Sequence, residues 1–195
     1  MNPALKLALD FTLRWEGGFV DHPDDPGGAT NHGVSLRWLK GLEVSIADID
    51  GDGDVDAEDI RALTIDQARD LFADRFWHGL SLDEFPPAVS IAVFDAAVNS
   101  GPRPAFRFLQ RALNLCGSTL EEDGIFGPAS RAELVRHAMP PNGPLLLVNG
   151  VNWARIKLMT TLAQRKNEAG RQPMQVFLPG WTNRVHALTK EIWRM

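Results

Sequence analysis

One stretch of the chain is almost entirely apolar: positions 88–100 read AVSIAVFDAAVNS and follow the pair Pro86-Pro87. Proline is favoured in the first turn of a helix, and a glycine such as Gly101 is typical of the position after the last turn. A helix with apolar residues on all sides must be buried on all sides. We therefore predict a central helix that begins at the proline pair, ends before Gly101 and is surrounded by the rest of the core.

Apolar periodicity and helix-start signals predict further helices along most of the chain. Thr64 and Gln67, for example, form a capping box, in which each side chain accepts a hydrogen bond from the other's backbone. The predicted helices cover residues 3–15, 35–42, 65–78, 103–115, 129–138, 144–169 and a last segment from Pro179. Residues 16–34 are rich in Gly, Pro and Asp, which predicts an irregular loop or a short hairpin near residue 20 or 30. The predicted fold class is therefore mainly α.

Length and composition restrict the fold further. The chain has 195 residues, 44% hydrophobic and 23% charged, which is typical of one globular domain, alone or with a small appendage. Its single cysteine, Cys116, excludes an intramolecular disulfide. No apolar stretch approaches the roughly 18 residues that suggest a membrane span. The apolar N-terminus carries Lys6, Asp10 and Arg14 and lacks a cleavage site, so we expect a helix of the mature protein and no signal peptide.

Residues 48–59, DIDGDGDVDAED, include no Lys or Arg, and their acidic residues are spaced as in an EF-hand calcium loop. The predicted metal ligands are Asp48, Asp50, Asp52, Asp54, Asp56 and Asp59, with Asp54 binding through its backbone carbonyl. The last loop position holds Asp59 where the longer Glu is usual, so we expect weaker closure. Only one such loop is present, which favours a structural calcium ion over a signalling switch. The alternative is an acidic loop that is simply solvated.

Charge is unevenly distributed along the chain. Residues 1–100 carry 7 Lys and Arg against 19 Asp and Glu, whereas residues 101–195 carry 13 against 6. A basic half favours a polyanionic partner, although a solvated basic face has the same composition.

The loop at 16–34 carries a set of residues suited to glycosidic hydrolysis. That reaction uses one carboxylic acid to protonate the leaving oxygen and a second carboxylate as base or nucleophile. Glu16 and Asp25 could supply these groups, and the hydroxyl of Thr30 could hold a water molecule. Asp21 and Asp24 lie in the same loop and compete with Asp25. Because such residues are also ordinary at helix ends and turns, their spacing alone leaves the function open.

Longer motifs resemble glycoside hydrolase family 108, whose members are N-acetylmuramidases that cut the peptidoglycan backbone. The motifs are EGGFVDHPDDPGGATNHGVS at 16–35, LTIDQARDLFADRFW at 63–77 and FDAAVNSG at 94–101. Three more, LQRALN at 109–114, DGIFGP at 123–128 and FLPGWTNRV at 177–185, resemble the peptidoglycan-binding region fused to that enzyme. The resemblance covers essentially the whole chain and implies a lysozyme-like helical fold.

The resemblance also implies roles for individual residues. The glutamate of the family's EGG motif falls on Glu16, which would be the proton donor, and its DPGGxT motif places an aspartate and a threonine at Asp25 and Thr30. We expect a catalytic part over residues 1–90, which carries the calcium loop, and a helical peptidoglycan-binding part over residues 91–195 packed against it.

Further residues are predicted to contact the sugar chain, namely Phe19, His32, Asn99 and Trp181. The family often has Tyr where this chain has Phe19. Asn99 and Asp95 lie four residues apart on the apolar central helix, where buried polar groups need partners, and this favours a structural role for the pair over a place in the sugar cleft. Trp181 follows Pro-Gly at a helix start, where its ring could stack on a sugar.

We therefore predict a bacteriolytic peptidoglycan hydrolase, an N-acetylmuramidase or lysozyme that cleaves the β-1,4 bond between N-acetylmuramic acid and N-acetylglucosamine. Calcium is its only predicted cofactor, and none is predicted for catalysis. The alternatives are a lytic transglycosylase, a non-catalytic peptidoglycan-binding or secretion accessory protein, and a zinc amidase using His22, Asp24 and His32.

The expected partner is bacterial peptidoglycan, with no nucleic acid and no membrane span, and the expected state is a monomer. Without a signal peptide, the protein would be made in the cytoplasm and act in the periplasm or on the cell wall. It would get there by holin-type release, as a phage or prophage endolysin does, or by dedicated export as a wall-remodelling enzyme.

Overall fold

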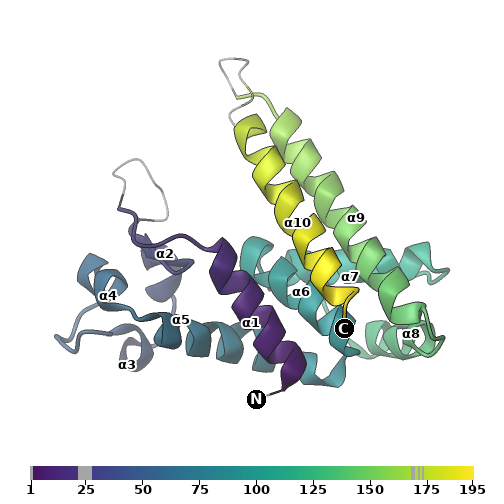
Figure 1. Cartoon of the computed structure of the whole chain (residues 1–195), viewed down its shortest axis with the longest axis horizontal. Coiled ribbons are helices and arrows are strands. Elements are labelled where there is room, and N and C mark those ends of the chain that lie inside the picture. Colours follow the sequence, from purple (N-terminus) through teal and green to yellow (C-terminus); the bar gives the residue numbers. More distant parts are fainter. Residues whose placement is uncertain (1, 22–27, 168–169, 171, 173) are drawn as a thin grey trace. The chain divides into compact units, whose positions relative to one another are not determined.

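The computed structural model describes residues 2–21, 28–167, 170, 172 and 174–195. The chain forms two compact units, one of residues 9–75 and one of residues 76–195 together with the first eight. Both are built mainly from helices, which confirms the predicted mainly α class (Figure 1). None of the helices in the described part of the chain is long and apolar enough to cross a membrane.

The unit of residues 9–75 contains a short hairpin. Helix α1 (Pro3–Trp15) enters this unit at Leu9, and strands β1 (Thr30–Asn31) and β2 (Val34–Ser35) then pair antiparallel. The two residues between the strands, His32 and Gly33, have φ of 49° and 82°. Two successive positive φ angles are typical of a type I′ hairpin turn. The hairpin predicted near residue 30 is therefore confirmed.

Four short helices complete this unit: α2 (Leu36–Leu39), α3 (Val44–Ala47), α4 (Ala57–Ala62) and α5 (Ile65–Phe72), the last continuing as a π-helical turn, η1 (Ala73–His78). The predicted capping box at Thr64 and Gln67 is present in both directions. Helices α3 and α4, which flank the acidic loop, are additions to the sequence prediction. The buried amide of Asn31 donates to the carbonyl oxygens of Ile60 (3.1 Å) and Leu63 (3.2 Å), so α4 and the segment after it hold β1 in place.

The second unit is a helical bundle around α6 (Pro87–Ser100), in which every residue from Val89 to Ala97 is buried. Its other helices are α7 (Pro102–Leu115), α8 (Pro128–Ala138), α9 (Gly143–Gln164) and α10 (Leu178–Ile192), with short 3-10 turns η2 (Leu82–Glu84) and η3 (Gln175–Phe177). Helices α7, α9 and α10 all pack on α6, and Figure 1 shows α9 and α10 side by side. The predicted central helix is confirmed.

Helix α9 ends earlier than predicted. The prediction ran to residue 169, and residues 168 and 169 lie outside the described part of the chain. Helix α9 ends at Gln164, and Arg165 is extended with φ −67° and ψ 124°. Residues 164–167 are all exposed, so a longer helix would bury no further apolar face. Helical propensity without tertiary packing is marginal, which explains the early end.

Candidate active site

Glu16 stands directly after the last residue of α1, and its half-buried side chain lies beside the hairpin turn. Its backbone N–H still donates to the carbonyl of Thr12 (3.1 Å), so its position is fixed by the helix. The N–H of His32, in the turn, donates to the carbonyl of Gly17 (3.1 Å). The end of α1 and the turn are thereby joined next to the carboxyl group of Glu16.

Gly33 contacts the Glu16 side chain closely. A Cβ atom at this position would lie 2.6 Å from Cγ, 2.8 Å from Cδ and 2.9 Å from Oε2 of Glu16. Only glycine leaves this space open and also adopts its φ of +82° without strain. Gly33 therefore positions the predicted acid. It was not among the predicted site residues, although the turn sequence Asn-His-Gly gave a signal for it.

Two other predicted residues, Thr30 and Phe19, lie in or next to the same hairpin. Thr30 forms a reciprocal pair of backbone hydrogen bonds with Val20 (2.8 Å each), and its hydroxyl donates to the carbonyl of Gly28 (3.4 Å). The ring of Phe19 is 37% exposed, and the guanidinium of Arg61 lies 4.8 Å from its centre. Asp25, like Asp24 and His22, lies outside the described residues, and Asp21 is exposed.

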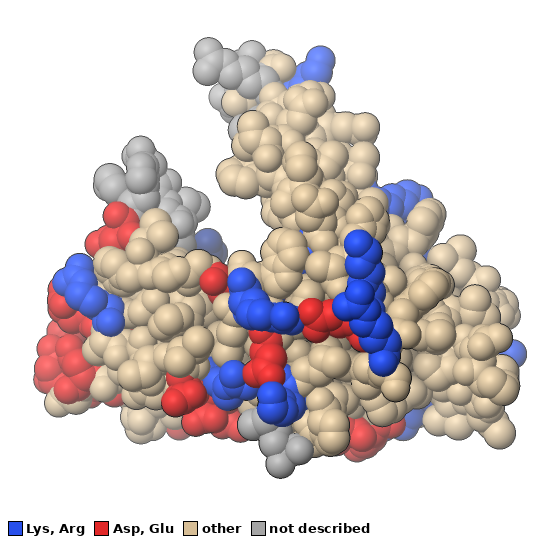
Figure 2. Space-filling view, viewed as in Figure 1, with Lys and Arg blue, Asp and Glu red and all other residues tan. Residues whose placement is uncertain are grey.

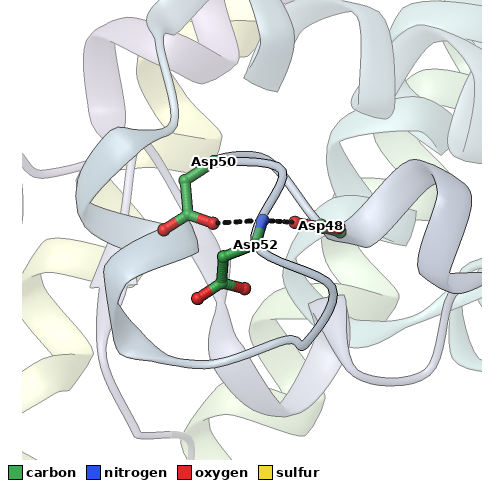
Figure 3. A group of neighbouring side chains, drawn as sticks. All are labelled: Asp48, Asp50 and Asp52. Atoms are coloured by element: carbon green, nitrogen blue, oxygen red, sulfur yellow. Dashed lines mark hydrogen bonds between the residues drawn. The ribbon is translucent and has the colours of Figure 1, made fainter.

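The acidic loop 48–59 gathers its carboxylates in two groups. One ligand oxygen from each of Asp48, Asp50 and Asp52 lies within 4.8 Å of the others, and the same holds for Asp54, Asp56 and Asp59. Figure 3 shows the first group around the backbone N–H of Asp52, which donates to Asp48 (3.1 Å) and Asp50 (3.3 Å). In Figure 2, Asp and Glu gather over the region of α3 and α4. Oxygens bound to one calcium ion at about 2.3–2.6 Å are no more than about 5 Å apart, so the spacing within each trio is compatible with oxygens that share one calcium ion.

Asp59 closes the loop on itself. Its Oδ1 accepts from the N–H groups of Ile49 (2.6 Å) and Asp50 (3.3 Å), and its Oδ2 accepts from the N–H of Asp56 (2.7 Å). Burial raises the pKa of Asp59, but these hydrogen bonds outweigh it and hold the pKa below its ordinary value. The short side chain at the last loop position thus serves three backbone donors.

The exposed carboxylates of the loop repel one another. Desolvation, followed by repulsion from Asp52, Asp59 and Asp48, raises the pKa of Asp50 above its ordinary value. Repulsion from Asp52 is the largest cause of the raised pKa of Asp54. A bound cation would relieve this repulsion.

Asn99 and Trp181, the two remaining predicted contacts, belong to the second unit. Both line one pocket of about 130 Å³ between α6, α7, α9 and α10. The ring of Trp181 stacks on Phe177, with centroids 5.9 Å apart and planes at 23°. The structure thus brings Glu16, Phe19, Thr30 and His32 together in one unit, and Asn99 and Trp181 in the other.

Asp95 pairs with two arginines inside the second unit. It accepts from Arg155 Nη2 at 2.6 Å and from Arg184 Nε at 3.0 Å and Nη2 at 2.8 Å. Desolvation raises the pKa of this fully buried group, but the charges of Arg155 and Arg184 outweigh it and hold the pKa below its ordinary value. Asp95 therefore stabilises the fold, which is one of the two roles that the sequence left open for it.

Comparisons with known proteins assign both regions of the chain. Residues 9–101 match the family described as Glycosyl hydrolase 108, and residues 104–186 match the family described as Predicted Peptidoglycan domain. The chain joins a glycoside hydrolase 108 region to a peptidoglycan-binding region. The family predicted from the motifs is thereby confirmed for residues 9–101, which supports a glycoside hydrolase, and the second match supports peptidoglycan as the partner.

A solved structure is similar to this chain over its full length. The structure of Brucella abortus SagA superposes with a TM-score of 0.71 at 27% sequence identity, covering 100% of this chain and 96% of that chain. No curated protein matches the sequence. The two matched family regions meet between α6 and α7, whereas the compact units divide the chain before Phe76. The predicted division at residues 90 and 91 stays a prediction, as do the roles of individual site residues.

Proposed function

We propose that the protein is an N-acetylmuramidase that hydrolyses the β-1,4 bond between N-acetylmuramic acid and N-acetylglucosamine in peptidoglycan. The observation that carries the proposal is the Glu16 carboxyl group, held against Gly33 at the end of α1 within the glycoside hydrolase 108 region. A helix end and a two-residue turn joined by backbone hydrogen bonds form a rigid support for a catalytic acid.

In the proposed reaction, Glu16 protonates the leaving glycosidic oxygen. Asp25 acts across the sugar ring, as the base that activates water or as the nucleophile, and Thr30 positions the water. Phe19 and His32 contact the substrate from the same hairpin, and Asn99 and Trp181 contact it in the second unit. No protein-bound cofactor takes part in the chemistry.

The test is digestion of purified peptidoglycan, followed by mass spectrometry of the soluble fragments. We expect reducing muramic acid ends from the wild type and none from Glu16→Gln, whose circular dichroism spectrum should be unchanged. Glu43→Gln removes an exposed carboxylate of the same unit and should keep wild-type turnover. Turnover by Glu16→Gln at the wild-type rate would refute the proposed acid.

The same products distinguish a lytic transglycosylase. Such an enzyme releases anhydro-muramic ends, which are lighter by one water, and needs no second carboxylate to activate water. Anhydro ends, together with full activity of Asp25→Asn, would replace the hydrolytic mechanism with this one. Binding to insoluble peptidoglycan without any soluble product would favour a non-catalytic accessory protein. An amidase would give soluble peptides with no new reducing sugar and would stop with a zinc-selective chelator.

We also propose that loop 48–59 binds one structural calcium ion. The support is the pair of Asp trios with oxygens within 4.8 Å and the mutual repulsion that raises the pKa values of Asp50 and Asp54. The ion would supply positive charge and crosslink the loop between α3 and α4.

Calorimetric titration and thermal unfolding test the calcium site. At a free calcium concentration of about 100 times Kd, we expect stabilisation by about 2.7 kcal/mol, seen as a higher Tm. Asp52→Asn should weaken the affinity at least about tenfold. Asp74→Asn, an exposed carboxylate of the same unit outside the loop, should leave it unchanged. If calcium produces no heat and no change of Tm, the loop binds no calcium and is an ordinary acidic loop.

We propose that the protein acts as a monomer on the cell wall, where its substrate lies, after holin-type release or dedicated export. Analytical ultracentrifugation measures the oligomeric state. Expression in the bacterial cytoplasm with and without a co-expressed holin tests the need for assisted release: lysis without the holin would contradict it.

A further inference from the structure

Asn31 ends β1 and begins the four-residue turn that contains His32 and Gly33. It pairs with Val34 across the hairpin. Directly opposed residues of two paired strands point to the same face. Both of these side chains are buried, that of Asn31 at 6% and that of Val34 at 0% exposed. The turn is therefore fixed to the interior of its unit by one polar and one apolar side chain.

The amide group of Asn31 satisfies two carbonyl groups at the end of α4. A helix leaves its last carbonyl groups without donors inside the helix. Ile60 lies in the last turn of α4, Leu63 is its C-terminal cap, and these residues are 0% and 2% exposed. Their carbonyl oxygens accept from Asn31 Nδ2 at 3.1 Å and 3.2 Å. An amide NH₂ group has two hydrogens, so one side chain serves both acceptors.

Neither an apolar side chain nor a carboxylate can replace this amide. An apolar side chain would leave two buried carbonyl oxygens without a donor, and a carboxylate would face them with acceptors alone. Helix α4 is itself held at its other end by a capping box between Asp56 and Asp59. Asn31 therefore connects the turn to a helix that is fixed at both ends.

We propose that Asn31 is a positioning residue for the reaction at Glu16, an inference that rests on the proposed function, in which Glu16 is the catalytic acid. The Asn31 amide holds the first residue of the turn on α4. The next residue, His32, donates its N–H to the carbonyl of Gly17 at the end of α1 (3.1 Å). Gly33 then lies against the side chain of Glu16. A displacement of the turn by about 1 Å would displace the carboxyl group, and an error of this size can cost about a hundredfold in rate.

Kinetics of the full chain on soluble peptidoglycan fragments test this role. Asn31→Ala removes both donors, and we expect kcat to fall on the order of a hundredfold. KM should change less than about threefold, because among the predicted sugar contacts only His32 lies in the turn. Asn31→Ser keeps one donor hydrogen, should lower kcat less, and is the second variant if circular dichroism shows that Asn31→Ala does not fold. A higher KM with an unchanged kcat would overturn the proposal, since it would assign Asn31 to substrate binding.

Asn152→Ala is the matched control. Asn152 is also 6% exposed, and its Nδ2 donates to Thr189 Oγ1 (2.9 Å), but this bond connects α9 to α10 in the second unit. We expect this variant to lose a comparable amount of stability in urea and to keep kcat within about twofold of the wild type. If Asn31→Ala keeps the wild-type kcat, or if Asn152→Ala loses as much of it, Asn31 has no positioning role.

A double mutant with Gly33→Ala tests the route. Both substitutions act on Glu16 through the same turn, so their losses of kcat should not multiply. We expect Asn31→Ala to lower kcat by less than about threefold when Gly33→Ala is already present. Losses that multiply would mean that Asn31 acts on the reaction independently of the turn, and would overturn the proposal.

Amide hydrogen exchange, measured by NMR, distinguishes this inference from the proposed function because it requires no turnover. The N–H of His32 should exchange at least about tenfold faster in Asn31→Ala than in the wild type, and at the wild-type rate in Asn152→Ala. If this difference is found and the wild type releases no sugar fragment, only the proposed enzyme is refuted. If the wild type is active and Asn31→Ala changes neither the exchange of His32 nor kcat, only the role of Asn31 is refuted.

Discussion

Gly33 has no side chain, and the space where a Cβ atom would lie is needed by the side chain of Glu16. Replacing it with alanine would place Cβ 2.6 Å from Glu16 Cγ, and the residue would keep a φ of +82° that costs alanine about 1–2 kcal/mol. We expect Gly33→Ala to displace the carboxyl group and to lower turnover on the order of a hundredfold, as misplacement of a catalytic group by about 1 Å can do. Release of reducing ends measures the effect.

Gly117→Ala is the matched control, because Gly117 has a φ of +103° but no atom within 4 Å of its Cβ position. It should lose a similar amount of stability and keep its turnover. If both variants keep wild-type turnover, Gly33 does not position Glu16.

Asp95 forms ion pairs with two arginines, Arg155 and Arg184, that are distant from it in sequence. Removing one partner of a buried ion pair leaves unbalanced charge, so we expect Asp95→Asn to lower the free energy of unfolding by about 3–5 kcal/mol at neutral pH. Glu58→Gln breaks the exposed Arg61–Glu58 pair, whose side chains are 53% and 58% exposed, and should cost less than about 1 kcal/mol. Urea denaturation measures both.

The pKa of Asp95 also predicts the pH dependence of this difference. Because the folded-state pKa lies below the unfolded-state value, the stabilising contribution is complete above the unfolded pKa of about 3.9 and is lost as pH falls through the folded pKa. The wild type and Asp95→Asn should therefore converge in stability as the pH falls below about 4. A gap that stays constant with decreasing pH would contradict this assignment.

At the scale of elements, α7 and α9 approach each other at Gly150. A Cβ atom there would lie 2.7 Å from Ala112 Cβ and 2.9 Å from Ala112 Cα. Alanine favours a helix over glycine by up to about 1 kcal/mol, but overpacking costs about 1–3 kcal/mol. We expect Gly150→Ala to destabilise the protein by up to about 2 kcal/mol, measured by urea denaturation.

Gly180 in α10 provides the comparison, since its Cβ position has no atom within 4 Å. There the helix preference should prevail, and Gly180→Ala should stabilise by up to about 1 kcal/mol. If both substitutions raise the free energy of unfolding by the same amount, α7 and α9 are not in close contact at Gly150.

At the scale of the whole molecule, the basic half of the chain should contribute to holding the substrate. Residues 101–195 carry 13 Lys and Arg against 6 Asp and Glu, and they contain the peptidoglycan-binding region. We expect Glu16→Gln to pellet with insoluble peptidoglycan as well as the wild type, and both to bind less as salt is raised. If the amount of pelleted protein depends on Glu16, or does not change with salt concentration, the basic half does not hold the substrate through its charge.

The sequence by itself determined the local features of this protein. The apolar run after Pro86-Pro87 predicted the buried helix α6, Thr64 and Gln67 predicted the start of α5, and the glycine-rich loop predicted the hairpin. Each of these depends on residues within a few positions of one another, whose backbone preferences and periodicity act locally.

Only the tertiary structure decided which distant residues meet. Asp95 finds its partners 60 and 89 positions further along the chain, and Glu16 meets Gly33 because the turn closes beside the end of α1. The early end of α9 likewise depends on where apolar neighbours stop, and the helix-forming residues after it do not reveal this. Burial and close packing act between segments that are far apart in sequence, so their outcome is fixed only when the chain has folded.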